Sequence, residues 1–139
     1  MWKEGADKPD FPKLEESFET DICIIGAGLT GLLSAYLLTK KGQRVAVLEK
    51  EKLGCGVTGL TTAFLTASID TDFSDIIRSF GPKDASEIVR SHSEAIDLIE
   101  KIAREEDISC EFQRCSNYLF ATSEKDISIV EEEHDAALE

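Results

Sequence analysis

The sequence predicts an α/β fold that opens with a strand, a helix and a second strand parallel to the first. Residues 20–25 (TDICII) and 44–49 (RVAVLE) are short, apolar and rich in β-branched side chains, which is typical of buried strands. Residues 29–41 are rich in Leu, end in two lysines and precede Gly42, a pattern typical of a helix and its stop. A unit of this kind, about thirty residues long, is expected to have a right-handed crossover.

The helix of this unit is expected to pack on one face of the two strands. Its buried side should carry Leu32, Ala35 and Leu38, which recur at three-residue spacing. Before the unit, residues 1–19 contain two of the three prolines and many charges, so they are expected to form an irregular lead-in.

Further elements are expected after the second strand. A loop rich in Gly and Thr leads into a β-prone segment at residues 61–67. Pro82 opens a long helix, because apolar residues follow it at three- and four-residue spacing. Residues 110–122 are expected to form two short strands around a turn at residues 116 and 117. Ser123 is expected to cap a final helix that begins at about Glu124.

Composition bounds the function. The chain has 139 residues, 42% of them hydrophobic, which suits one globular domain with a core. The net charge is −13, and residues 61–139 carry 19 acidic against 7 basic side chains, so nucleic acid and anionic membrane surfaces are poor partners. The four cysteines lack zinc-ligand spacing and are expected to be reduced thiols of a cytoplasmic protein, with no metal bound.

The uncharged run at residues 22–39 is long enough to suggest a membrane span. This run contains three glycines within six consecutive positions, directly after a predicted strand. Each glycine weakens a helix interior by about 1 kcal/mol. No membrane span is therefore expected.

The same glycines predict a dinucleotide-binding turn. Residues 26–31 read G-A-G-L-T-G between a strand and a helix, the context that the G-x-G-x-x-G motif requires. Gly26 permits the tight turn, Gly28 permits close approach of a pyrophosphate, and Gly31 permits tight packing of the helix. The helix N-terminus attracts the phosphates, and Glu49 is placed to accept hydrogen bonds from a ribose. The alternative is a tight turn that binds no ligand.

These residues, together with the loop that follows, resemble the D-amino-acid oxidase and glycine oxidase superfamily of FAD-dependent oxidoreductases. The resemblance is specific from Asp21 to about Ala67 and topological beyond, and it implies FAD as cofactor. It implies a Rossmann-like FAD/NAD(P)-binding βαβ region at residues 20–80 and the beginning of an α+β substrate domain at 81–139. The wording "TTAFLT" is most similar to a bacterial branch with a distant Rieske domain.

The resemblance also implies site residues. The pyrophosphate would lie against residues 26–31, the adenosine ribose against Glu49, and the adenine edge against Lys50. A loop that wraps the cofactor would supply further contacts, although Cys55 and Gly56 vary from the commoner family wording. The complete set of expected cofactor-binding residues is Gly26, Ala27, Gly28, Leu29, Thr30, Gly31, Glu49, Lys50, Gly56, Thr58, Thr61 and Thr62.

The function implied by the resemblance is oxidation of a small amine or amino acid by hydride transfer to the flavin. No catalytic residue is assigned: His92 is expected to be a half-buried structural residue, His134 to be exposed, and Cys55 to be a small loop residue. Members of this superfamily are usually more than twice as long, so we expect an N-terminal part of the enzyme, inactive alone, that either self-associates or is marginally stable. Two alternatives stay open, a non-catalytic module that binds the ADP moiety and an NAD-linked dehydrogenase.

Overall fold

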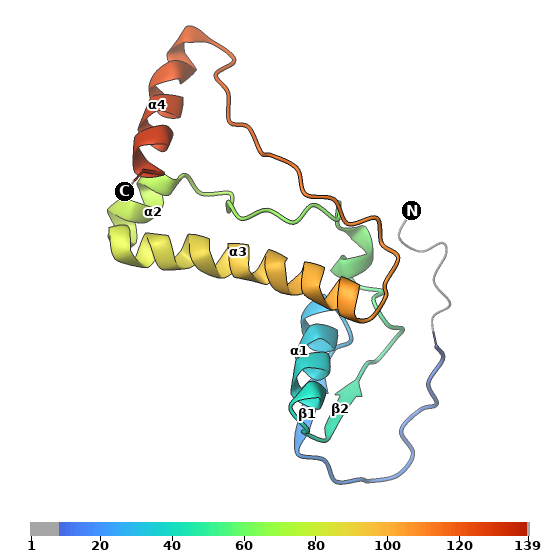
Figure 1. The fold of residues 1–139 in the computed structure, drawn as a ribbon. Helices are drawn as coiled ribbons and strands as arrows, with labels where there is room; N and C mark the ends of the chain where they lie inside the picture. Colours follow the sequence, from blue (N-terminus) through green and yellow to red (C-terminus); the bar gives the residue numbers. More distant parts are fainter. Residues whose placement is uncertain (1–8, 139) are drawn as a thin grey trace. The chain divides into compact units, whose positions relative to one another are not determined.

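The computed structural model describes residues 9–138 and divides the chain into two compact units, which meet in sequence at Phe64 and Leu65. The first unit contains β1 (Ile22–Ile25), α1 (Leu29–Lys40), β2 (Val45–Leu48) and the 3-10 helix η1 (Val57–Leu60) (Figure 1). The second contains α2 (Phe73–Phe80), α3 (Pro82–Glu105), the 3-10 helix η2 (Glu124–Asp126) and α4 (Ile127–Ala136). The predicted division at residues 80 and 81 stays a prediction, and residues 1–8 of the lead-in lie outside the described residues.

β1 and β2 form a two-stranded parallel sheet, which confirms the predicted pairing. Ile22 pairs with Val45 and Ile25 with Leu48, so each strand has four residues rather than the expected six. Thr20 and Asp21 precede β1 and still contact the start of β2, because the Asp21 carboxylate accepts the Arg44 backbone N–H at 3.0 Å and pairs with its guanidinium at 2.8 Å.

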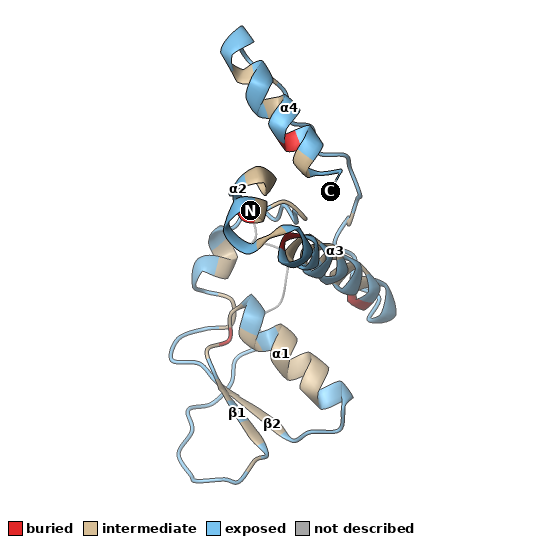
Figure 2. Ribbon diagram, turned by 90° about the vertical axis from the view of Figure 1, so that its left-hand side faces the viewer, coloured by how far each residue is buried: buried red, intermediate tan, exposed pale blue. Residues whose placement is uncertain are grey.

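α1 packs on this sheet, contacting both strands, and ends as predicted before Gly42. Gly42 has a φ of +80° and donates its N–H to the Thr39 carbonyl at 2.9 Å. Ala35 and Leu38 are half-buried, as Figure 2 shows for most of the middle of α1, but Leu32 is 38% exposed, so its predicted burial is wrong. The physical reason is that a sheet of two strands is too narrow to cover the whole apolar face of a helix.

The second unit is helical where it is regular. α3 begins at Pro82 and runs to Glu105, as the periodicity predicts, and buries Ala85 and Ile102. α2 was not expected from the sequence; it buries Ile76 and contacts both α3 and α4.

Two predicted β segments are not strands in the described chain. Residues 61–67 follow η1 without regular structure, and Ala63 adopts a φ of +60°, which is incompatible with a strand. The expected hairpin at residues 110–122 also has no regular structure. A two-stranded hairpin alone is marginally stable, so this stretch needs other support.

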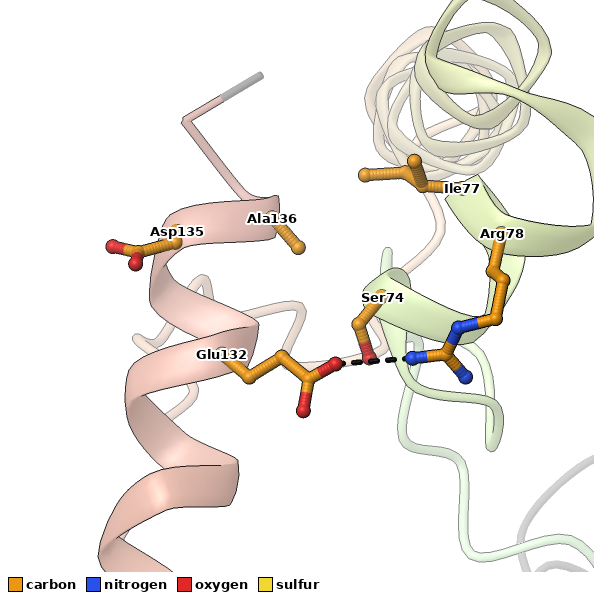
Figure 3. A pocket seen from close by; sticks show the side chains of 6 residues that line it. All are labelled: Ser74, Ile77, Arg78, Glu132, Asp135 and Ala136. Atoms are coloured by element: carbon orange, nitrogen blue, oxygen red, sulfur yellow. Dashed lines mark hydrogen bonds and ion pairs between the residues drawn. The ribbon is translucent and has the colours of Figure 1, made fainter.

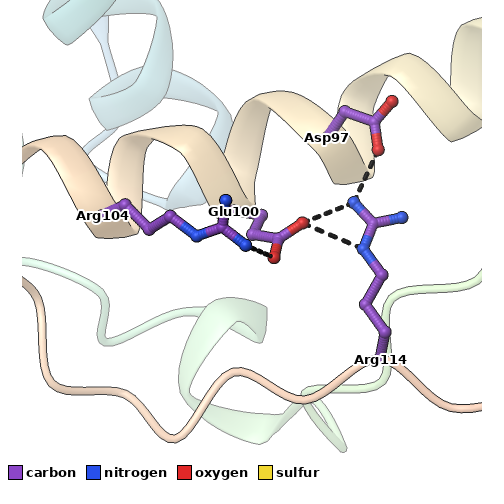
Figure 4. A network of polar contacts seen from close by, with 4 residues as sticks. All are labelled: Asp97, Glu100, Arg104 and Arg114. Carbon is purple, nitrogen blue, oxygen red and sulfur yellow. Dashed lines mark hydrogen bonds and ion pairs between the residues drawn. The ribbon is translucent and has the colours of Figure 1, made fainter.

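That support comes from ion pairs with α3. The Arg114 guanidinium contacts Asp97 at 2.5 Å and Glu100 at 2.6 Å, and Glu100 also pairs with Arg104 (Figure 4). These carboxylates raise the pKa of Arg114, with Glu100 the larger cause. The irregular segment is thus held to the helix by charge rather than by a β-ladder.

The final helix begins as predicted in position but not in detail. Ser123 precedes η2, and its hydroxyl bonds the Asp126 carboxylate at 2.9 Å instead of a backbone N–H of the helix. α4 follows from Ile127.

Candidate dinucleotide-binding site

The turn between β1 and α1 uses its glycines for conformation and for close packing. Gly26 has a φ of +100°, and its N–H donates to the Leu48 carbonyl at 2.7 Å, which ties the turn to the end of β2. A Cβ on Gly31 would lie 2.0 Å from the backbone oxygen of Gly26, so only glycine lets the helix approach the turn this closely. Gly26 and Gly31 of the motif are therefore favoured by the geometry of the backbone.

Glu49 joins the end of β2 to this turn. Its Oε2 accepts the backbone N–H of Ala27 at 2.8 Å, and its Oε1 accepts that of Glu51 at 2.9 Å. The Ala27 and Glu51 hydrogen bonds lower the pKa of Glu49, so the side chain is a carboxylate at neutral pH. Because the side chain is exposed and each oxygen has two lone pairs, it retains room to accept further hydrogen bonds from hydroxyl groups.

Thr58, on η1, meets the N-terminus of α1. Its hydroxyl accepts the Leu29 N–H at 3.0 Å, and a Cβ on Gly28 would lie 3.3 Å from the same oxygen. Gly28 is the N-cap of α1, and the first turn of the helix carries no acidic residue. The Leu29 N–H at the positive end of the helix dipole is therefore bonded by a neutral hydroxyl.

The other predicted binding residues lie around this centre. Thr30 is exposed in the first turn of α1, and Gly56 is the N-cap of η1. The Thr61 hydroxyl donates to the Thr58 carbonyl at 3.4 Å, and Thr62 is exposed just beyond. Lys50 pairs with its neighbour Glu51 at 3.7 Å, and not with the turn.

Sequence reasoning missed one residue of this cluster. The N–H of Gly54 donates to the Ala27 carbonyl at 2.9 Å, and Gly54 has a φ of +64°. The only sequence indication was a glycine two positions before Gly56, which by itself predicts a turn and no more.

The side chains considered as catalytic candidates lie elsewhere or stand alone. His92 is half-buried on α3 with Nδ1 2.9 Å from the Ile88 carbonyl, and His134 is exposed beside Asp135. Cys55 is an exposed free thiol, as are Cys23, Cys110 and Cys115. Among residues 9–138 no three His, Cys, Asp or Glu side chains are grouped to hold a metal ion. Across the same residues, none of the helices combines the length and apolarity that crossing a bilayer requires.

A separate hollow of about 490 Å³ lies in the second unit, between α2 and α4. Figure 3 shows the Arg78–Glu132 ion pair, 3.0 Å long, bridging the two helices there, with Ser74 beside it. Its lining has no glycine turn and its one cation is already paired, so it does not resemble the site in the first unit.

Known proteins are similar in sequence to this chain over most of its length. The family model described as FAD dependent oxidoreductase matches residues 21–139. A Bacillus subtilis protein named as a Rieske 2Fe-2S iron-sulfur protein, YhfW, is 39% identical over 97% of this chain and 26% of its own length. Gamma-glutamylputrescine oxidoreductase of Escherichia coli is 31% identical over 88% of this chain and 29% of its own length.

Another relative matches only about half of the chain. Thiamine thiazole synthase of Thermotoga maritima is 38% identical over 69 residues, 49% of this chain and 28% of that protein. The chain thus spans between a quarter and a third of the length of these relatives. No solved structure matches significantly. The family model covers most of the sequence, including the glycine turn and Glu49, and the chain belongs to the family of FAD-dependent oxidoreductases.

Proposed function

We propose that the β1–α1 turn and the loop after β2 bind the ADP part of FAD in an oxidoreductase that acts on a small amine or amino acid. The observation that carries this proposal is the junction of Glu49 with the glycine turn. Its carboxylate holds the Ala27 N–H at 2.8 Å while the adjacent helix N-terminus has no acidic side chain in its first turn. A dinucleotide needs both features, an acceptor for ribose hydroxyls and a positive end for phosphates.

The described residues fit such a ligand. A Cβ on Gly28 would lie 3.3 Å from the Thr58 hydroxyl, so glycine at this position lets polar oxygen atoms approach the backbone of the helix start closely, as a phosphate would have to. In this proposal residues 26–31 bind the pyrophosphate and Glu49 the adenosine ribose. Lys50 lies toward the adenine edge, and Gly56, Thr58, Thr61 and Thr62 lie along the phosphate and ribityl side.

FAD, when bound, supplies a hydride acceptor for oxidation of a carbon that bears an amine. The residues of this chain bind and orient it, and none is proposed as a catalytic acid or base. The name of the E. coli relative, an oxidoreductase of gamma-glutamylputrescine, supports an amine substrate. The four free cysteines support a reducing, cytoplasmic setting.

A second candidate is a nucleotide-binding module that performs no chemistry. It is favoured by one observation: the hydrogen bond that joins Glu49 to Ala27 lies where the ADP half of the proposed ligand would bind. The NAD-linked alternative receives less support, since the matching family is FAD-dependent.

Calorimetric titration of FAD and of ADP into the 139-residue chain tests the proposal. We expect similar, weak affinities, because the flavin ring adds few contacts to those made by ADP. The Gly28→Val variant should lose binding of both, since its side chain fills the space for phosphate, while its circular dichroism spectrum is retained. Undiminished binding by that variant, or no binding of ADP by the parent chain, contradicts the proposed site.

We also propose that the isolated chain self-associates. Ile25, Leu60 and Phe64 of the first unit are 88%, 77% and 80% exposed, more apolar surface than a stable monomer usually presents. Light scattering after gel filtration should give a mass above that of one chain. A sharp, thermally stable monomer would contradict this.

A further inference from the structure

We propose that Gly54 is a positioning residue of the nucleotide site, required for the left-handed conformation that anchors the loop after β2 to Ala27. This inference rests on the proposed function, and it concerns a residue outside the set that is proposed to bind the ligand. The segment involved, residues 49–58, is called the strap below, because it begins at Glu49 and ends at Thr58, both of which contact the glycine turn.

The strap forms hydrogen bonds with both backbone polar groups of Ala27. The Ala27 N–H donates to the Glu49 carboxylate at 2.8 Å, and the Ala27 carbonyl accepts the Gly54 N–H at 2.9 Å. Ala27 is fully buried, with 0% of its surface exposed. Every backbone polar group of this buried residue therefore depends on the strap, and the position of the strap depends on Ala27.

Gly54 is the point where the strap changes direction. Its φ of +64° lies in the left-handed region, which side chains with a Cβ avoid. A Cβ built at Gly54 meets nothing within 4 Å, so space does not exclude other residues. Backbone conformation, and not space, favours glycine here.

The consequence reaches the helix N-terminus. Four residues after Gly54, the Thr58 hydroxyl accepts the Leu29 N–H at 3.0 Å. A strap that leaves the left-handed conformation at Gly54 releases Ala27 and moves Thr58 and Glu49 together. The fraction of chains with a competent site falls, and the apparent affinity for ADP falls in proportion.

The same unit provides a matched control. Gly42 also has a positive φ, +80°, and also meets nothing within 4 Å of a built Cβ. It lies after the C-terminal end of α1, where its N–H bonds Thr39. Alanine therefore introduces the same kind of backbone strain at both positions, but only one of them belongs to the strap.

The experiment compares Gly54→Ala, Gly42→Ala and Gly54→Asn in the full 139-residue chain, with ADP as the calorimetric probe and thermal melting as a measure of stability. Both alanine variants should melt at similarly lowered temperatures. Only Gly54→Ala should bind ADP more weakly, by about fivefold or more. Gly54→Asn should bind ADP within about twofold of the parent chain, because asparagine tolerates the left-handed region.

Each other outcome is decisive. Equal ADP affinities of the two alanine variants overturn the role of Gly54 while leaving the proposed function intact. The same holds if Gly54→Asn is as weak as Gly54→Ala, or if Gly54→Ala no longer folds, because the role would then be one in folding. Failure of the parent chain to bind ADP refutes the proposed function itself and is distinguished by that result alone.

Discussion

Glu49 in the first unit and Glu133 in the second each bind two backbone N–H groups, but they stand differently toward a helix. Glu49 accepts the N–H of Ala27 and of Glu51 and lies beside the start of α1 without occupying it. Glu133, on α4, accepts the N–H of Phe73 at 2.7 Å and of Ser74 at 3.0 Å, the first two residues of α2. Glu49 is exposed, whereas Glu133 is only 7% exposed.

This difference separates the proposed ligand site from a contact that is structural. The N-terminus of α2 already holds a carboxylate of the chain, which satisfies its donors and neutralises its partial positive charge. The N-terminus of α1 holds a neutral hydroxyl, so its positive end remains available to an external anion. In the proposed function, the two helix starts thus serve different purposes.

The largest expected effect is loss of the first unit by Gly31→Ala. The added Cβ would lie 2.0 Å from the Gly26 carbonyl oxygen, which belongs to a turn fixed at both ends, so we expect a loss of about 3 kcal/mol or more in the free energy of unfolding. Urea unfolding followed by circular dichroism measures it. Ser34→Ala, on the same helix, should stay within about 0.5 kcal/mol of the parent. Equal stability of the two variants would mean that α1 does not pack on the turn.

The next effect concerns the contact of Glu133 with the first two residues of α2, in the second unit. Glu133→Ala leaves the N–H groups of Phe73 and Ser74 without their acceptor, at a cost of about 2 kcal/mol. Amide hydrogen exchange at Phe73 should accelerate accordingly. Glu131→Ala removes an exposed carboxylate from the same helix and should leave that exchange rate unchanged. If Glu131→Ala accelerates exchange as much as Glu133→Ala does, the cap is not specific.

Low pH should weaken the same contact between Glu133 and α2. Burial alone would raise the pKa of Glu133, but its hydrogen bonds from Ser74 and Phe73 outweigh burial and lower it from the ordinary 4.5. The stabilisation is therefore complete above that value and is lost as the pH falls through the lower pKa of the folded state. The charged side chains around it, Asp72, Asp75, Arg78 and Glu132, are the same in the parent and in Glu133→Gln. Thermal melts at pH values from above 4.5 downward should show that the melting temperature falls more steeply for the parent than for Glu133→Gln. Identical pH dependence of the two melting temperatures would contradict the account.

The smallest effect is expected at the open helix start. Thr58→Val removes the neutral acceptor of the Leu29 N–H, which water replaces because the site is exposed, so unfolding should change by only about 0.5 kcal/mol. Thr39→Val, at the other end of α1, is the matched control. A loss as large as that of Glu133→Ala would show that α1 is capped as firmly as α2.

Much of the first unit follows from local sequence. The strand pairing, the extent of α1 and the stop at Gly42 were predicted, because glycine punctuation and apolar runs act over a few residues. Glu49 was assigned to the ribose from its place at the end of the second strand, and its hydrogen bond with the Ala27 N–H was not predicted. The strap conformation at Gly54 was not predicted, since nothing in a lone glycine tells which carbonyl its N–H will find.

The second unit was less predictable, because its main hydrogen bonds connect residues that are far apart in the sequence. Glu133 and Phe73 are separated by 60 positions, and no periodicity relates them. The segment 110–122 has strand-like composition, yet a strand needs a partner, and Arg114 instead pairs with carboxylates of α3. α2 was missed because its eight residues are too few for a clear periodic pattern.

The most direct test of the contrast between the two helix starts is an amide chemical-shift map of the chain titrated with ADP. The account predicts that the amide signals of residues 26–31 and of Thr58 move progressively with ADP, while those of Phe73 and Ser74 stay where they are. Signals of Phe73 and Ser74 that move with ADP, or signals of residues 26–31 that do not, would contradict it.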